Sequence, residues 1–361
     1  GNLCWVGCLW IFYRVFRSLE LSLWYFAPVP WLWLNIQSFE NMFWGVSSLC
    51  NFGVLFLGIS ALYYGAFSRS SISWQALGLA LLATFTYGNG LMIWVVLGLI
   101  GWLRGRHLFL GVIIALGALT AYVYFIDFTP ITQNLDWRIG QQLRAGLAGF
   151  FGFIGSLATL DAYNQAPTRL TTSVVTGLVF IVTTFILFRN DLWAIIRGLV
   201  GRPLSLSPAS FFTLSIFIFV AITAFAVVYK RIPTDEFVGM FKGRYRMYST
   251  LWLVGLYVTM LSYRPVWLQQ NKVLSMLIVG SVLLHLVLLY ANLDRAINNR
   301  RMAVVNYFNS RYNVDWLGLQ MFDMSQQYFE SIRDLYDSDD PLAEGWNPRT
   351  PHDSLMPLAG L

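Results

Sequence analysis

The sequence predicts an all-α fold: a polytopic bundle of about nine to eleven transmembrane helices, followed by a short helical C-terminal tail. Of its 361 residues, 57% are hydrophobic and only 12% are charged, whereas roughly a quarter of a soluble domain is charged. Apolar runs recur along the chain at about 20 residues, the length that crosses a bilayer as a helix. Backbone polar groups in lipid must be satisfied internally, so these runs are expected to be helical.

Ten apolar segments mark the expected helices. The first begins at Gly1 without a Met, so we expect missing upstream residues and a shortened first span. The second contains Pro28 and Pro30, which predict a kinked or shortened helix. The sixth carries glycines at positions 146, 149, 152 and 155, a stripe typical of close helix packing. The segments cover residues 1–16, 21–36, 42–66, 75–103, 108–126, 143–160, 170–188, 211–229, 247–263 and 273–291.

The fourth segment is too long for one untilted span. Tyr87, Gly88, Asn89 and Gly90 interrupt it, and two glycines around an asparagine favour a break. We therefore expect a broken helix near residues 87–90, with Asn89 in a pocket, because non-helical backbone at membrane depth must be buried or line a wet cavity. The membrane orientation stays open. The basic loops all fall on the cytoplasmic side only if segment four crosses once or segment six is re-entrant.

Two regions follow from the change in composition: a transmembrane domain, residues 1–292, and a polar tail, residues 293–361. The tail is shorter than most independent domains. Between Met321 and Leu335 apolar residues share one helical face, which predicts a short amphipathic helix that packs loosely on the membrane surface.

The charge pattern indicates membrane lipids, and not nucleic acid, as the expected partner. The net charge is +6, but Lys and Arg stand in short clusters between apolar runs, as in loops near lipid headgroups. Three cysteines show no metal or disulfide spacing, and phosphate-loop, dinucleotide and His-Glu metal motifs are missing. We predict neither a metal nor a cofactor.

Polar groups at segment ends are the candidate ligand contacts. Glu40 and Asn41, followed by Trp44, meet a membrane boundary, where a carboxylate can bind a sugar hydroxyl or act as a base. Capping of the following helix is the competing interpretation. Arg244 and Arg246 open a late segment, and their guanidinium groups suit a phosphate or pyrophosphate. An ordinary interfacial basic cluster is the alternative there.

The order of these motifs resembles a known superfamily. GNL at the start, ENMFW at residues 40–44, TFTYGNG at 84–90 and GRYR at 243–246 together resemble uncharacterised bacterial multi-span proteins related to the C-type membrane glycosyltransferases. The resemblance covers residues 1–292. It implies an inner-membrane enzyme that transfers a sugar from a polyprenyl-phosphate donor on the extracytoplasmic face, in envelope polysaccharide or glycolipid assembly. The acidic residue that it implies follows the first span and would lie upstream of Gly1, so the catalytic residue stays unassigned.

In such an enzyme, two arginines would hold the phosphate and the other candidates would contact the sugar or line its groove. We expect Glu40, Asn89, Arg244 and Arg246 to converge on one extracytoplasmic cavity. The substrate-binding candidates are Glu40, Asn41, Trp44, Tyr87, Asn89, Arg244 and Arg246.

The alternative function is a transporter, a flippase or a non-catalytic membrane subunit of an envelope assembly pathway. Such proteins also need broken helices and intramembrane polar groups. Transporters often show an internal repeat with matching broken segments. One clear break is visible, at residues 87–90, and this favours the transferase.

Overall fold

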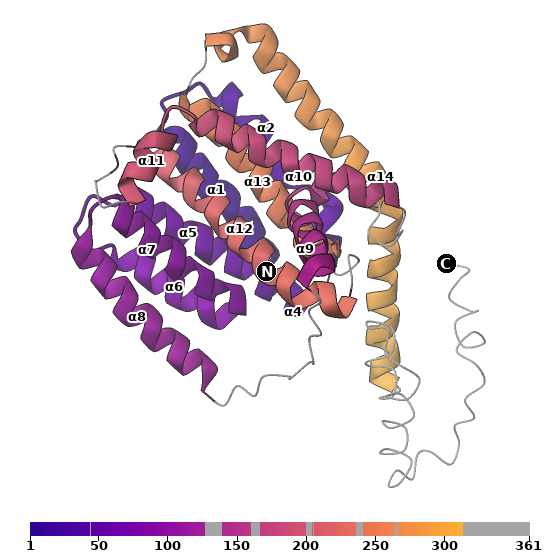
Figure 1. Ribbon diagram of the computed structural model, residues 1–361. Coiled ribbons are helices and arrows are strands. Elements are labelled where there is room, and N and C mark those ends of the chain that lie inside the picture. The colour runs from indigo at the N-terminus through magenta and orange to yellow at the C-terminus, as the bar shows by residue number, and fades with distance from the viewer. Residues whose placement is uncertain are drawn as a thin grey trace. The chain divides into compact units, whose positions relative to one another are not determined.

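The computed structural model describes residues 1–43, 45–126, 139–159, 167–199, 204, 206–235, 241–263 and 266–312. Every regular element in these ranges is a helix (Figure 1), as predicted. The chain forms two compact units, Gly1–Asn299 and Arg300–Leu361. Five stretches are long and apolar enough to cross a membrane: Gly45–Phe67, His107–Phe125, Leu170–Phe188, Pro208–Arg231 and Asn271–Asn298.

The first helix, α1 (Asn2–Arg17), packs against α5 (Gly53–Phe67). The proline-containing second segment is shortened, as predicted: it consists of η1 (Leu23–Phe26), α2 (Pro28–Trp33) and η2 (Ile36–Ser38). Three short elements then lead into α5 and carry the chain past Glu40 and Asn41. They are α3 (Phe39–Phe43), α4 (Gly45–Ser47) and the π-helical turn η3 (Ser48–Phe52).

The predicted break in segment four is confirmed, and it is a complete reversal. The chain folds back through η4 (Gly88–Gly90) between α6 (Trp74–Thr86) and α7 (Leu91–Leu103). The two arms are antiparallel, because Trp94 Nε1 donates to Thr84 Oγ1 at 3.0 Å across the turn. Each arm has 13 residues, which at the helical rise gives about 20 Å.

Helix α8 (His107–Phe125) returns beside α7, and α6, α7 and α8 lie side by side (Figure 1). Helices α9 (Ile139–Ile154) and α10 (Pro167–Phe188), joined through η5 (Ser156–Ala158), then cross closely. A Cβ on Gly155 would lie 2.0 Å from the Ser173 carbonyl oxygen, and one on Gly177 would lie 1.9 Å from that of Phe151. Of the predicted glycine stripe, Gly155 makes the close backbone approach, whereas nothing lies within 4 Å of a Cβ added at Gly146.

The remaining helices are α11 (Leu192–Leu199), α12 (Pro208–Asp235), α13 (Gly243–Tyr263) and α14 (Asn271–Tyr312), with η7 (Val266–Gln269) before α14. Most of α13 is buried, because it packs against α2, α9, α10 and α12. Helix α14 continues through residue 292, where the sequence predicted the domain boundary. The predicted amphipathic helix at Met321 to Leu335 lies outside the described residues.

The direction of α13 defines two ends of the first unit. We name the end at the start of α13 the Tyr248 end, and the end where α13 finishes at Tyr263 the Arg104 end. Helix α8 finishes at the Tyr248 end, where the Tyr124 hydroxyl lies by Gly88. Helix α10 starts there too, with Ser173 bonded to Thr159, and finishes with Phe188 against Tyr263 at the other end. The connection from α8 to α10, which contains α9, therefore begins and finishes at the same end of the unit.

Candidate functional site

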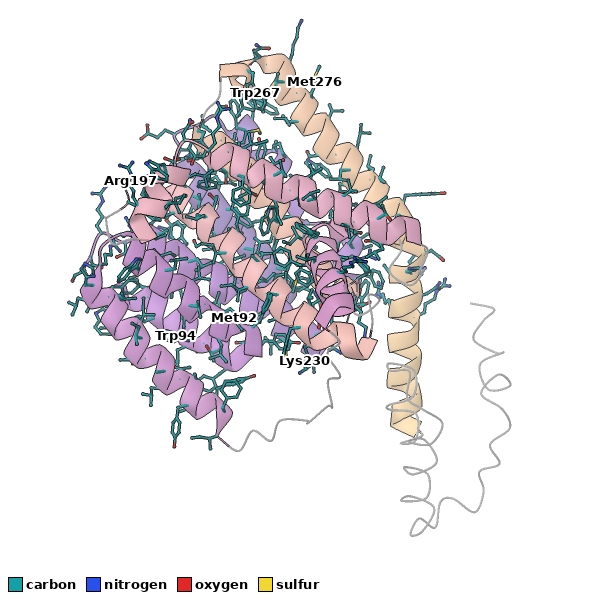
Figure 2. All side chains as sticks on the ribbon, in the orientation of Figure 1. Met92, Trp94, Arg197, Lys230, Trp267 and Met276 are labelled. Atoms are coloured by element: carbon teal, nitrogen blue, oxygen red, sulfur yellow. The ribbon has the colours of Figure 1, made fainter. Side chains whose placement is uncertain are left out.

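A cavity of about 350 Å³ lies at the Tyr248 end. Four tyrosines, two cations and two polar side chains contribute to its wall, which is built from the hairpin turn and from α7, α8, α12 and α13. Met92 and Lys230, both in this wall, are labelled in Figure 2. The lining residues are Tyr87, Gly88, Asn89, Met92, Tyr124, Thr223, Ala226, Val227, Lys230, Arg231, Tyr245 and Tyr248.

The glycines of the hairpin turn bring Asn89 into this wall. A Cβ on Gly90 would lie 2.2 Å from the Ala83 carbonyl oxygen, so only glycine lets the chain reverse this tightly. A Cβ on Gly88 would lie 2.7 Å from the Tyr124 hydroxyl. Held in this turn, Asn89 donates a hydrogen bond through Nδ2 to the Tyr248 hydroxyl.

Two tyrosines of α13 form the part of the cavity wall next to the hairpin turn. Tyr245 and Tyr248 are three residues apart, so they lie on neighbouring turns of one helix face. Tyr248 is 1% exposed, and the rings of Phe153 and Phe219 pack around it, with centroids at 5.7 and 6.2 Å. This packing holds the Tyr248 hydroxyl in place against the tip of the hairpin.

Charge in the cavity wall is positive. Lys230 is exposed and Arg231 is half-buried, at the end of α12. Burial raises the pKa of the Tyr87 hydroxyl, and the charges of Arg244 and Arg231 oppose this shift without reversing it. Among the described lining residues none is Asp or Glu. The cavity therefore combines an aromatic lining with a cationic edge, which suits an anionic ligand with an apolar or sugar face.

Glu40 caps a helix, but a different helix from the one expected. Its carboxylate accepts the backbone N–H of Arg244 at 3.3 Å, at the first turn of α13. Gly243 makes this approach possible, because a Cβ there would lie 3.2 Å from the Glu40 carboxyl carbon. A carboxylate at this position also interacts favourably with the positive end of the helix dipole.

Asn41 is fully buried at the same junction. Its Nδ2 donates to the Arg244 carbonyl at 3.1 Å, and its Oδ1 accepts from Ser47 Oγ at 2.7 Å and Asn51 Nδ2 at 3.1 Å. Asn41 thus ties the segment before α5 to the start of α13. All of its hydrogen bonds are internal to the protein, so its geometry is that of a structural junction.

The two arginines of the GRYR motif point to different surroundings. Arg244 places its guanidinium 5.3 Å from the ring centroid of Tyr245, a lining residue, but is not itself among the residues that line the cavity. Arg246 is fully buried and donates from Nε to the Phe241 carbonyl at 3.2 Å and from Nη1 to Asn292 Oδ1 at 3.3 Å. Residues two apart on a helix lie about 200° apart around its axis, so one ligand does not meet both side chains.

Of the seven predicted contacts, the structure brings Tyr87 and Asn89 into the cavity wall, and Arg244 contacts the ring of the lining residue Tyr245. Glu40 and Asn41 hold the start of α13, and Arg246 contacts α14. Trp44 lies outside the described residues. The expected convergence of Glu40, Asn89, Arg244 and Arg246 on a single cavity is not the geometry observed.

Sequence reasoning missed most of the cavity wall. Tyr245 was inside the GRYR motif, and its three-residue spacing from Tyr248 was a visible signal of a shared helix face. Lys230 and Arg231 follow an apolar segment, a position that by itself indicates only a basic loop. Thr223, a hydroxyl within an apolar helix, belongs to a class of residue that often serves helix contacts or a ligand.

Comparison of the chain with protein-family models, curated proteins and solved structures found no match. The resemblance to membrane glycosyltransferases therefore rests on the sequence motifs. The cavity and its chemistry are the structural basis for a functional argument.

Proposed function

We propose that this protein is a polytopic protein of the bacterial inner membrane that binds a polyprenyl-phosphate-linked sugar in the cavity at the Tyr248 end, as a glycosyltransferase related to the C-type superfamily. One observation carries the proposal: a single cavity joins tyrosine rings, buried polar atoms and the cations Lys230 and Arg231. Aromatic rings stack on sugar faces, and cations bind phosphate through charge-assisted hydrogen bonds.

The distribution of buried residues supports the membrane setting. In the apolar stretches of α8, α10 and α14 only 17% of residues are buried inside the protein, against 61% for α12. Apolar side chains exposed over whole helices are unfavourable in water, so these three helices are suited to face lipid tails. A cavity in such a bundle is accessible to a substrate that arrives through the membrane.

Sugar transfer also requires a base for the acceptor hydroxyl. The described part of the cavity wall contains no carboxylate, and this favours a second candidate, a carrier or flippase that binds the same lipid-linked sugar without reacting it. Both functions share the binding step. They differ in whether a sugar appears on an acceptor.

Binding is the direct test of the proposal. The full chain, purified in detergent and transferred to nanodiscs, is titrated with a set of polyprenyl-phosphate hexoses and pentoses. We expect the double variant K230Q/R231Q to bind its best ligand at least about tenfold more weakly, because each lost contact to phosphate is worth about 1.5–3 kcal/mol. The matched control is R189Q/R197Q, which removes two cations around α11, far from the cavity (Arg197 in Figure 2).

Equal affinity of the cavity variant and the wild-type protein would exclude the cavity as the phosphate site. A transfer assay with radiolabelled donor then separates the two candidates. Labelled product on an acceptor lipid or glycan supports the transferase, and tight binding with transbilayer movement of intact donor supports the carrier.

A further inference from the structure

Two oxygen atoms in the cavity wall are buried without a hydrogen-bond partner in the described part of the chain: Asn89 Oδ1 and Thr223 Oγ1. Thr223 is only 2% exposed. Buried polar atoms are nearly always paired, because an unpaired one loses its hydration without compensation. Both atoms belong to the same cavity, so a molecule in that cavity is the natural partner for them.

Thr223 differs from three other threonines in the apolar helices. Thr213 in the same helix donates to the Ser210 carbonyl at 3.2 Å, Thr184 to Phe180 at 2.8 Å and Thr259 to Gly255 at 2.8 Å. Such bonds to a carbonyl one turn back are the usual solution for a threonine in a helix without water. The Thr223 hydroxyl makes no such bond in the described part of the chain, and Thr223 is one of the residues that line the cavity.

Asn89 presents a defined atom to the ligand. Its Nδ2 is engaged with the Tyr248 hydroxyl, which leaves Oδ1 as an acceptor. An ionised phosphate oxygen has no proton to donate to this acceptor, whereas a hydroxyl group donates one bond and accepts others. A hydroxyl group placed between these two lining residues would donate to Asn89 Oδ1 and accept from Thr223 Oγ1.

We infer that Asn89 and Thr223 form a subsite for one hydroxyl group of the sugar, with the phosphate held toward Lys230 and Arg231. The inference rests on the proposed function and adds to it the group that the protein recognises: the sugar and not only the lipid phosphate. Tyr248 is a positioning residue in this arrangement, because it fixes the amide of Asn89 and does not itself need to touch the sugar.

The test compares two ligands on the same protein: the polyprenyl-phosphate sugar that binds the wild-type chain best, and polyprenyl phosphate without a sugar. We expect T223V, which keeps the shape and removes the hydroxyl, to weaken binding of the sugar-bearing lipid about three- to tenfold. Binding of the bare lipid stays unchanged. The matched control is T213V, the same substitution in the same helix, whose hydroxyl bonds within the helix.

Y248F supplies a second measurement that does not depend on Thr223. It should reduce the preference for the sugar-bearing lipid over the bare lipid and leave the affinity for the bare lipid intact, which a merely structural role would not do. Equal effects of T223V on both ligands, or no effect on either, overturn the subsite. Failure of both ligands to bind the wild-type chain overturns instead the proposed function on which the subsite depends.

Discussion

The carboxylate of Glu40 accepts a hydrogen bond from the backbone N–H of Arg244 across 204 positions of sequence, at 3.3 Å. The first turn of a helix has backbone N–H groups without partners in the helix, and a side-chain acceptor that satisfies one of them stabilises the helix start. The start of α13 is thus held by a distant segment. The same helix carries Tyr245 and Tyr248 into the cavity wall.

This contact predicts that E40A destabilises the protein and leaves ligand binding intact. Loss of a cap costs about 0.5–2 kcal/mol of unfolding free energy, and loss of the favourable dipole interaction adds to it. Thermal unfolding in detergent, followed by tryptophan fluorescence, measures the change. The conservative variant E40Q should lose less unfolding free energy than E40A. A folded E40Q protein that no longer binds the lipid-linked sugar would instead support the sugar contact that the sequence suggested.

The hairpin turn predicts opposite effects of two glycine substitutions. G90A places a Cβ 2.2 Å from the Ala83 carbonyl oxygen, so the backbone must move, and we expect a loss of about 1–3 kcal/mol together with weaker ligand binding at Asn89. G78A is the matched control, because nothing lies within 4 Å of its added Cβ in the middle of α6. It should be neutral or stabilise the chain, since alanine favours a helix. Equal melting temperatures for the two variants would contradict the tight reversal.

The buried Arg246 predicts a strong dependence on Asn292. N292A removes the acceptor of Arg246 Nη1 in a fully buried environment, and a hydrogen bond to a charged group is worth about 1.5–3 kcal/mol. N292D keeps an acceptor and should retain most of the stability. The exposed Asn298, on the same helix, provides the control N298A, expected within about 0.5 kcal/mol of wild type. Urea or thermal unfolding measures the stability of the three variants and distinguishes them.

At the Arg104 end, a positive charge alone is not sufficient to stabilise the fold, because the shape of the arginine side chain also matters. Arg104 donates from Nη1 to the carbonyls of Gly65 and Ala66 at the end of α5 and lies 5.1 Å from the Phe211 ring centroid. We expect R104K to destabilise the protein by about 1–2 kcal/mol, since lysine lacks the planar fork that reaches two acceptors and a ring. The exposed Arg189 serves as control through R189K.

Burial, and then the charge of Arg106, lowers the pKa of Arg104 to about 10. The unfolded chain therefore binds this proton more tightly than the folded one. By linkage, this shift in pKa lowers the stability of the folded state at pH values below about 10. The loss is relieved as the pH rises from about 10 toward the ordinary pKa of arginine.

The all-helical fold and the break at residues 87–90 were predictable, because apolar run length and glycine chemistry are local properties. The reversal at the break was not, since two glycines around an asparagine are compatible with both a kink and a hairpin. It depends on the contact between Trp94 and Thr84. Likewise, Asn89 was identified from its local surroundings, whereas its partner Tyr248 is 159 positions away.

The predicted site residues that lie outside the cavity show the same limit of prediction from sequence. The two arginines of GRYR were treated as one clamp, although their two-residue spacing on a helix already places them on opposite sides. Glu40 was weighed as a cap for its own helix, and its observed partner, the N–H of Arg244, is set by tertiary packing. Sequence patterns identified chemically capable residues, but the tertiary fold decides which of them meet.

The fold-back at η4 also bears on how the chain enters its membrane. Both arms of the hairpin have their outer ends at the Arg104 end, where Ser73 contacts the Tyr64 carbonyl and Arg104 contacts that of Gly65. During insertion, only the turn at residues 87–90 has to be carried inward, and it contains no charged side chain. A charged residue at the centre of a membrane-inserted helix costs about 2.5–3.5 kcal/mol on biological insertion scales, and the turn contains none. The segment that delivers Asn89 to the cavity can therefore insert as a preformed pair of helices.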